Sequence, residues 1–242
     1  MTSVLITVPN EHWLHKAVVQ RLMLLQNDGR YRLRFEFPSH KPYENNLHHI
    51  VRDFHAGNTC GGRKACTCSG REPRRQACGG RHADFWLSID SDNPPMNNPL
   101  DLVELDLDIV GLPTPVWHYV GKPGERPIYW NAYDYVPESD AYKEHSTKEG
   151  LQRVDAIGTG CFLIARRVFE HPGMREAPFR RKLHADGTVH KGNDISFCER
   201  ARARGFQVWA HYGYPCRHYN ANIELSEIES AMKNLWEGVH HG

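Results

Sequence analysis

One short stretch, Asp84–Pro95, limits what this chain can fold into more than any other. Its first part, Phe85–Ile89, is an uncharged run of aromatic and branched residues, which is typical of a buried strand. A proline pair follows and cannot continue a central strand, so the chain must turn just after Asp92. Side chains alternate along a strand, so Asp90 and Asp92 are expected to point to the same side. The sequence therefore predicts two convergent carboxylates at one sheet edge.

Two carboxylates at a sheet edge could form a ligand-binding site. In an open α/β sheet, ligands bind outside the carboxyl ends of the strands. Paired carboxylate oxygens there suit Mg²⁺ or Mn²⁺ carrying a phosphate-rich substrate. The alternative is a solvated Asp/Asn turn without a ligand, because these residues are common in turns.

Elements before this strand set the fold class. A strand is expected over residues 4–8, followed by helical spacing from about residue 12 to 25 with Asn10 as its N-cap. A second strand over 31–37 and a second helix over 44–54 complete the pattern. Strands alternating with helices predict an α/β fold with a mostly parallel central sheet flanked by helices.

The rest of the chain continues this pattern less regularly. We expect one domain over 1–242, with residues 58–82 as an inserted cysteine-rich loop. The expected elements after residue 97 are a short helix over 98–105, a strand over 109–117 broken by prolines, a strand over 128–133, a polar mobile loop over 138–150, a glycine turn and strand over 154–165, a short helix over 166–169, a helix from 193 to about 204, a strand over 207–212 and an amphipathic helix over 225–235.

Overall charge excludes some function classes. The chain has 242 residues, with 30 Lys and Arg against 29 Asp and Glu, so any attraction to nucleic acid or membrane must be local. No uncharged run approaches the roughly 20 residues of a membrane span, and the first residues do not resemble a signal peptide. We therefore expect a soluble, cytoplasmic protein without a membrane partner.

Four of the seven cysteines crowd into the inserted loop. They can close a tetrahedral, structural Zn²⁺ site, although free or redox-active thiols and disulfides are alternatives. Almost no apolar residue lies in this loop, so burial cannot order it, whereas metal ligation can. The four cysteines are Cys60, Cys66, Cys68 and Cys78.

The same loop is strongly basic. Its cations face a single acidic residue, Glu72, which makes the loop a candidate anion-binding surface that could hold a DNA backbone; a solvated loop is the ordinary alternative. The residues concerned are Arg63, Lys64, Arg71, Arg74 and Arg75.

Several separated motifs match one family in order and spacing. The chain resembles nucleotide-sugar-dependent glycosyltransferases of the GT-A type, particularly the short phage-encoded ones. The resemblance spans nearly the whole chain except 58–82 and 118–150. The motifs that carry it are Pro9-Asn-Glu11, Pro42-Tyr-Glu-Asn-Asn46, Asp90-Ser-Asp92, Gly158-Thr-Gly-Cys-Phe-Leu-Ile164, Gly192-Asn-Asp194 and Cys216-Arg-His218.

The resemblance implies a GT-A-like fold and a role for each motif. The metal, Mn²⁺ or Mg²⁺, would be held by Asp92 with help from Asp90, and by His218, which could equally be a surface histidine. A nucleotide-sugar donor, most simply a UDP-sugar, would contact Pro9, Asn10, Glu11, Tyr43, Asn45, Asn46, Asp90 and Ser91. The acceptor would lie on Gly158, Thr159 and Gly160, which could also be plain turn residues.

Asp194 resembles the family's catalytic base, which accepts the proton of the attacking hydroxyl and gives inversion at the anomeric carbon. The family position normally carries two adjacent acidic residues, and here the first is Asn193. The alternative is that Asn193 or Asp194 only caps the following helix.

These inferences favour an inverting, metal-dependent hexosyltransferase acting in the cytoplasm, the host's cytoplasm if the protein is phage-encoded. The favoured acceptor is 5-hydroxymethylpyrimidine in DNA. Two alternatives stay open: transfer to a glycan, lipid or protein, and a zinc-containing nucleic-acid-binding protein whose transferase site is idle.

Overall fold

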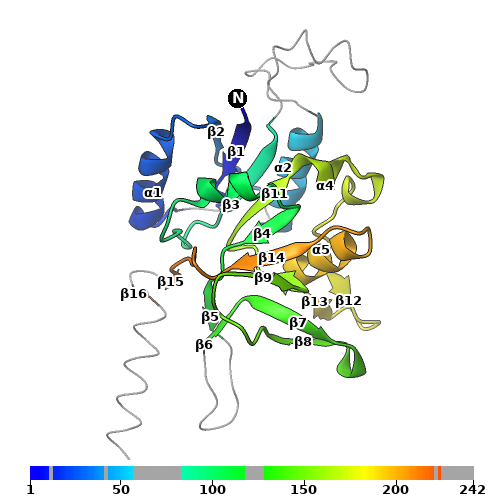
Figure 1. Ribbon diagram of the computed structural model, residues 1–242. Helices are drawn as coiled ribbons and strands as arrows, with labels where there is room; N and C mark the ends of the chain where they lie inside the picture. The colour runs from blue at the N-terminus through cyan, green and yellow to red at the C-terminus, as the bar shows by residue number, and fades with distance from the viewer. Residues whose placement is uncertain (11–12, 41–42, 57–82, 118–127, 221–222, 225–242) are drawn as a thin grey trace, which may run out of the picture.

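The chain is described from a computed structural model that places residues 1–10, 13–40, 43–56, 83–117, 128–220 and 223–224. Within these residues, a seven-stranded sheet forms the centre of the molecule (Figure 1). Its strands, in spatial order, are β2 (Arg32–Glu36), β1 (Ser3–Thr7), β3 (Phe85–Ile89), β11 (Cys161–Ala165), β4 (Ile109–Gly111), β14 (Val208–His211) and β9 (Leu151–Val154).

The sheet is mixed, but most of its strands run in the same direction. β1 is parallel to both β2 and β3, and β14 is parallel to β4. β11 is antiparallel to both of its neighbours, and β9 is antiparallel to β14. Consequently β1, β2, β3, β4 and β14 all end at the same edge of the sheet, where the residues following β3 lie.

Helices cover both faces of this sheet, as Figure 1 shows. Alternate residues of β3 serve the two faces: Phe85 and Leu87 pack with the apolar side chains of α1 and η1, whereas Trp86 packs with those of α2, α4 and α5. This alternation is the period-two pattern of a strand buried on both sides. The helices are α1 (Lys16–Gln26), η1 (Pro99–Leu105), α2 (Tyr43–Ala56), α4 (Arg166–Glu170) and α5 (Asn193–Arg202).

Trp86 is the centre of the second face. It is fully buried, its indole Nε1 donates to Thr7 Oγ1 at 2.8 Å, and its ring packs against Phe162, with 5.1 Å between ring centroids. Burying an aromatic side chain of this size contributes on the order of 2–3 kcal/mol, and the hydrogen bond satisfies its one polar atom. β3 is therefore fixed firmly to β1 and β11 just before the chain reaches Asp90.

Short elements complete the described part of the chain. β7 (Ala132–Val136) pairs with both β8 (Ala141–Glu144) and β10 (Ala156–Ile157). Two-stranded pairs and short 3-10 helices account for the remainder: β5 (Pro115–Trp117) with β6 (Ile128–Trp130), β12 (Lys182–Leu183) with β13 (Val189–Lys191), β15 (Tyr219–Asn220) with β16 (Ile223–Glu224), η2 (Pro137–Ser139) and η3 (Pro172–Met174).

Two local predictions were wrong. The first helix begins at Lys16 and is capped by His15, whose Nδ1 accepts from the Ala17 N–H at 3.3 Å; Asn10 lies too far upstream to cap it. The polar loop expected over 138–150 contains η2 and β8, because β8 gains its hydrogen bonds from β7 despite its polar sequence. The helix predicted over 225–235 and the inserted loop lie outside the described residues.

Among the residues that the structure describes, no helix is long and apolar enough to span a bilayer.

Candidate active site

The two aspartates of the Asp90-Ser-Asp92 motif lie at the sheet edge where β3 ends. The Asp90 N–H donates to the Gly160 carbonyl at 2.8 Å, and the Asn93 N–H closes a turn onto the Asp90 carbonyl at 3.2 Å. The Tyr219 N–H donates to the Asp92 carbonyl at 3.0 Å. The motif is therefore held by the glycine loop on one side and by the segment that carries His218 on the other.

Tyr43, the first residue of α2, is hydrogen-bonded to the first aspartate. Its Oη donates to Asp90 Oδ1 at 2.5 Å. Burial, together with the negative charges of Asp92 and Asp194, raises the pKa of Asp90 to about 8, against the lowering effect of Tyr43 and His218. A carboxylate with so raised a pKa is typical of functional sites, where charge is concentrated in a poorly solvated place.

His218 faces the second aspartate. Its Nε2 lies 3.7 Å from Asp92 Oδ2, and its Nδ1 lies 2.7 Å from the Pro115 carbonyl oxygen. Because a carbonyl can only accept, Nδ1 carries a proton, which leaves the Nε2 lone pair of a neutral ring directed toward Asp92. Burial works against protonation of the ring, but Asp92 and the Pro115 carbonyl outweigh it and raise the pKa of His218.

The sequence predicts a divalent cation at these side chains. In the part of the chain that the structure describes, no three His, Cys, Asp or Glu side chains are grouped closely enough to hold a metal ion. Asp92 and His218 supply two ligand atoms, and Mg²⁺ or Mn²⁺ often takes its remaining ligands from water and substrate phosphates. The pair therefore fits a cation that binds together with a diphosphate. Asp90 is directed to Tyr43 instead.

Asp194 lies in the first turn of α5. The N-cap of this helix is Gly192, so neither Asn193 nor Asp194 is the capping residue. Asp194 Oδ1 accepts from the Ile195 N–H at 2.8 Å. Burial raises the pKa of Asp194, partly offset by the positive charge of Arg181. A buried carboxylate that holds protons more readily than usual therefore lies near the Asp90–Asp92 edge.

The glycine loop between β10 and β11 packs closely onto this edge. A Cβ at Gly158 would lie 2.4 Å from Asn131 Nδ2, and one at Gly160 would lie 2.6 Å from Asn93 Oδ1. The glycines are thus required by two asparagine side chains of the scaffold. Thr159 between them has the freer side chain, and its hydrogen bond lowers the pKa of Tyr43, which burial and Asp90 raise well above its usual value.

The predicted nucleotide-binding residues differ in burial and in the contacts they make. Asn10 Nδ2 donates to the Val8 carbonyl at 3.2 Å, which fixes the end of β1. Asn46 is fully buried and its Oδ1 accepts from the His40 N–H, so it joins α2 to the segment after β2. Pro9 is buried and Asn45 is exposed. Tyr43 of this group contacts the aspartate motif directly, through Asp90.

Some predicted residues lie outside the described residues: Glu11, the four cysteines Cys60, Cys66, Cys68 and Cys78, and the basic residues Arg63, Lys64, Arg71, Arg74 and Arg75. The zinc site and the DNA-backbone surface of the inserted loop therefore stay predictions.

Two residues near Asp194 were not predicted from the sequence as site residues. Burial and the charge of Asp194 raise the pKa of Tyr133, which places this β7 tyrosine beside the carboxylate. Arg181, just before β12, forms an ion pair with Glu44 of α2 and also acts on Asp194. Neither belongs to a motif, because each reaches the site from an element far away in the sequence.

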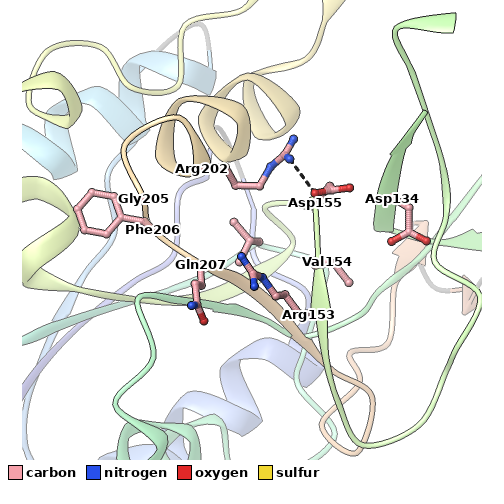
Figure 2. A pocket seen from close by; sticks show the side chains of 9 residues that line it. Asp134, Arg153, Val154, Asp155, Arg202, Gly205, Phe206 and Gln207 are labelled. Atoms are coloured by element: carbon pink, nitrogen blue, oxygen red, sulfur yellow. Dashed lines mark hydrogen bonds and ion pairs between the residues drawn. The ribbon is translucent and has the colours of Figure 1, made fainter. Parts of the chain in front are cut away.

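A cavity of about 470 Å³ lies elsewhere, where β9 and β14 meet the end of α5 (Figure 2). Arg202 Nη1 donates to Asp155 Oδ1 on its wall at 2.7 Å, and Asp134 Oδ1 lies 2.7 Å from His145 Nδ1. Its carboxylates are thus already engaged, and it lies at the opposite end of α5 from Asp194. The chemistry favours the Asp90–Asp92 edge, despite the size of this cavity.

Comparison of the sequence with protein-family models and with curated proteins finds no significant match. Among solved structures, the chain is similar to A197 from STIV, with a TM-score of 0.54 and 13% sequence identity over 91% of this chain and 87% of that one. A weaker likeness is to GalNAc-T7, in a structure with UDP, GalNAc and Mn²⁺: TM-score 0.46, 13% identity, 90% of this chain and 44% of that one. Another is to HddC from Yersinia pseudotuberculosis, with TM-score 0.30 and 10% identity over 71% and 80% of the two chains.

At 13% identity, the likeness to A197 shows the fold alone. With the strand order observed here, it confirms the predicted class, an α/β fold of GT-A-like architecture with a mostly parallel sheet flanked by helices. One fold can host many activities, so the function depends on the side chains of the site itself.

Proposed function

We propose that the chain is a metal-dependent, inverting glycosyltransferase that uses a nucleotide-sugar donor. One observation carries this proposal. Asp90, Asp92, Asp194 and His218 come from three separate parts of the sequence and meet at the carboxyl edge of the sheet, with two raised carboxylate pKa values among them. Carboxylates that differ in environment are suited to different tasks, here donor binding and proton transfer.

The donor's diphosphate would lie against Asp92 and His218. A divalent cation held by this pair, when bound, would supply a Lewis acid for the negative charge that builds on the leaving group. Asp90, held by Tyr43 at 2.5 Å, would position the ribose or a water beside it. The nucleotide would extend from there toward Pro9, Asn10, Glu11 and Asn45, and a UDP-sugar is the simplest donor.

In the transfer step, an acceptor hydroxyl oxygen forms a bond to the anomeric carbon while the bond from that carbon to the phosphate oxygen breaks. Asp194 accepts the hydroxyl proton, and the nucleoside diphosphate leaves with the bonding electrons. Attack from the side opposite the diphosphate inverts the anomeric centre, and a hexose is the expected sugar. Because Asn193 is neutral, Asp194 is the one carboxylate of its motif that could act as the base.

The favoured acceptor is 5-hydroxymethylpyrimidine in DNA. The positive charges of the inserted loop would hold the phosphate backbone without reading its sequence, and the loop's cysteines would hold a structural Zn²⁺. The target base would have to leave the stack to reach Asp194. Transfer to a glycan, lipid or protein is the second candidate, and a nucleic-acid-binding protein with an idle site is the third.

Mass spectrometry of DNA tests this function. Duplexes with and without 5-hydroxymethylpyrimidine are incubated with the protein, Mn²⁺ and each common sugar nucleotide in turn. We expect a mass increase of one hexose on the modified duplex alone. Nucleotide release without any change in the DNA would redirect the search to glycan, lipid or protein acceptors, and the absence of any turnover would favour the idle-site alternative.

A further inference from the structure

A cationic ridge lies along the end of α5, on the face of the sheet covered by α2 and α5. We define it as Arg180, Arg200 and Arg204, which come from the segment before β12 and from the end of α5. The segment 175–182 carries four cations and one acidic residue, Glu176. The ridge lies in the described part of the chain and is separate from the inserted basic loop.

A buried aromatic residue fixes the ridge to the core. Phe179 is fully buried, and its ring stacks on Phe197 of α5 with 4.3 Å between centroids and an angle of 10° between the planes. Its neighbour Arg180 is exposed. Stacked, desolvated aromatic pairs are rigid and worth about 1 kcal/mol beyond their burial. Arg180 is therefore presented to solvent from an anchored piece of backbone.

Arg200 of α5 contacts the same segment, and Arg204, two residues after the helix, contacts Arg200. Arg200 Nη1 donates to the Ala177 carbonyl at 3.3 Å, and Arg204 Nη1 donates to the Arg200 carbonyl at 2.9 Å. Both use one guanidinium nitrogen on a backbone carbonyl, which orients the planar group and leaves other N–H donors for a ligand.

These charges are not neutralised by carboxylates. In the described ranges, neither Arg180, Arg200 nor Arg204 forms an ion pair. Two of the nearby carboxylates are occupied, since Glu44 is paired with Arg181, and Glu199 with Lys182 and Lys191. Burial and the positive charges of Arg180 and Arg204 lower the pKa of Arg200, so the guanidinium groups repel one another. An anion lying across the ridge would relieve this repulsion.

The ridge is also correctly placed for an acceptor. α5 carries Asp194 in its first turn and Arg200 six residues later, a distance of about 9 Å along the helix axis at 1.5 Å per residue. Phosphates follow one another at about 3.4 Å of axis per strand in duplex DNA. Six residues also turn the helix by about 600°, so Arg200 leaves α5 about 120° around the axis from Asp194. A strand whose target sugar or base lies at Asp194 would therefore contact Arg200 where it passes around α5, two or three phosphates along.

We propose that this ridge binds the phosphodiester backbone of a nucleic-acid acceptor, with Arg180 and Arg200 as the principal contacts. The proposal rests on the function proposed above, which it deepens by naming the acceptor class and the surface that holds it. Arginine's planar fork matches phosphate oxygens. Burial and the charges of Arg180 and Arg200 lower the pKa of His48 on α2, against the raising effect of Glu44, so this histidine adjoins the ridge.

The test is the salt dependence of DNA binding. Fluorescence anisotropy of a labelled duplex is measured from about 50 to about 200 mM salt for wild type, the exposed single variant Arg180→Gln and the double variant Arg180→Gln/Arg200→Gln. The double variant should bind at least about tenfold more weakly at low salt, and the slope of its log affinity against log salt should be smaller in magnitude by about 1.8. In the single variant, the slope should decrease by about half of that amount. The matched control is Lys16→Gln/Arg21→Gln, which removes two cations from α1 on the other face of the sheet and should bind as wild type does.

Nucleoside diphosphate release from the donor is measured on the wild type in the same series. No release at all would overturn the proposed function, whatever the DNA result. Release by the wild type together with equal DNA affinity and slope in the double variant and the control would overturn the ridge proposal alone. Binding of anionic vesicles or an acidic glycan, but not of DNA, that depends on Arg180 and Arg200 would also overturn it, because the ridge would then serve another class of acceptor.

Discussion

Replacing Asp194 by asparagine separates the roles of this carboxylate in catalysis and in stability. The amide has nearly the same shape, and its Oδ1 can still accept from the Ile195 N–H, which lies 2.8 Å from the aspartate oxygen. It cannot take the acceptor proton. Loss of a general base costs about 10²- to 10⁴-fold in kcat, which corresponds to roughly 2.7–5.4 kcal/mol of barrier.

Asp194→Asn should lower kcat, but it should not lower the stability of the fold. Burial raises the pKa of Asp194, so the folded chain binds a proton at this site more readily than the unfolded chain does. Protonation therefore stabilises the fold below the folded-state pKa, and this contribution is lost as the pH rises through that pKa. At neutral pH the ionised carboxylate disfavours the fold, so Asp194→Asn should melt at the same temperature as wild type or higher.

The assays are kcat at saturating donor and acceptor, and thermal unfolding on both sides of neutral pH. The wild-type kcat should fall with decreasing pH through an ionisation above the usual aspartate range, because only the ionised base is active. Asp194→Ala serves as the control, since it also removes the Ile195 hydrogen bond and should lose about 1 kcal/mol of stability. A variant Asp194→Asn with normal kcat, or one that loses stability while it keeps kcat, would refute the assignment of Asp194 as the base.

Three further predictions concern the hydrogen bond to Asp90, a buried lysine and the cysteine-rich loop. Tyr43→Phe keeps the ring but removes the hydroxyl that donates a hydrogen bond to Asp90 Oδ1 at 2.5 Å. The kcat/KM for the sugar nucleotide should then fall about tenfold, with little change in melting temperature. Steady-state kinetics and calorimetry check this, and an unchanged kcat/KM would contradict it. Lys191→Met removes the cation that lies 2.5 Å from Asp140 Oδ1 and 2.7 Å from Glu199 Oε1, and should lower the melting temperature by several degrees; an unchanged melting curve would show that the ion pairs contribute nothing. Elemental analysis of freshly purified protein should find about one zinc per chain, lost when Cys66 and Cys68 are replaced by serine; a zinc-free wild type would remove the proposed metal from the loop.

The sequence was sufficient for the parts of the fold that depend on local pattern. The strand Phe85–Ile89 is buried along its whole length, and the motif after it lies where the proline pair required a turn. Apolar runs of this kind have few alternatives. β8 was missed because Ala141–Glu144 is polar and half exposed, so its strand structure depends on pairing with β7, which no local pattern shows.

The positions of the motif residues in the fold were predictable to the same degree. Asp90, Asp92 and Asp194 belong to motifs, and the structure brings them to one region. Tyr133 and Arg181 were missed because each influences Asp194 from a distant element, and a lone tyrosine or arginine in a sequence has many possible roles. The glycines of the 158–160 loop were predicted to lie under the acceptor or to be plain turn residues; the structure adds that their missing side chains make room for Asn131 and Asn93.

The most direct test of a metal-dependent sugar-nucleotide site is nucleoside diphosphate release, measured across a panel of sugar nucleotides with and without Mn²⁺, for wild type and Asp92→Asn. Asp92 faces His218 across 3.7 Å, and an amide would leave the cation with a neutral oxygen in place of a carboxylate. The account predicts release from at least one donor that requires Mn²⁺ and falls about 10²-fold or more in Asp92→Asn, with the fold intact. Release that is equal in Asp92→Asn and wild type, or no release from any donor, would contradict it.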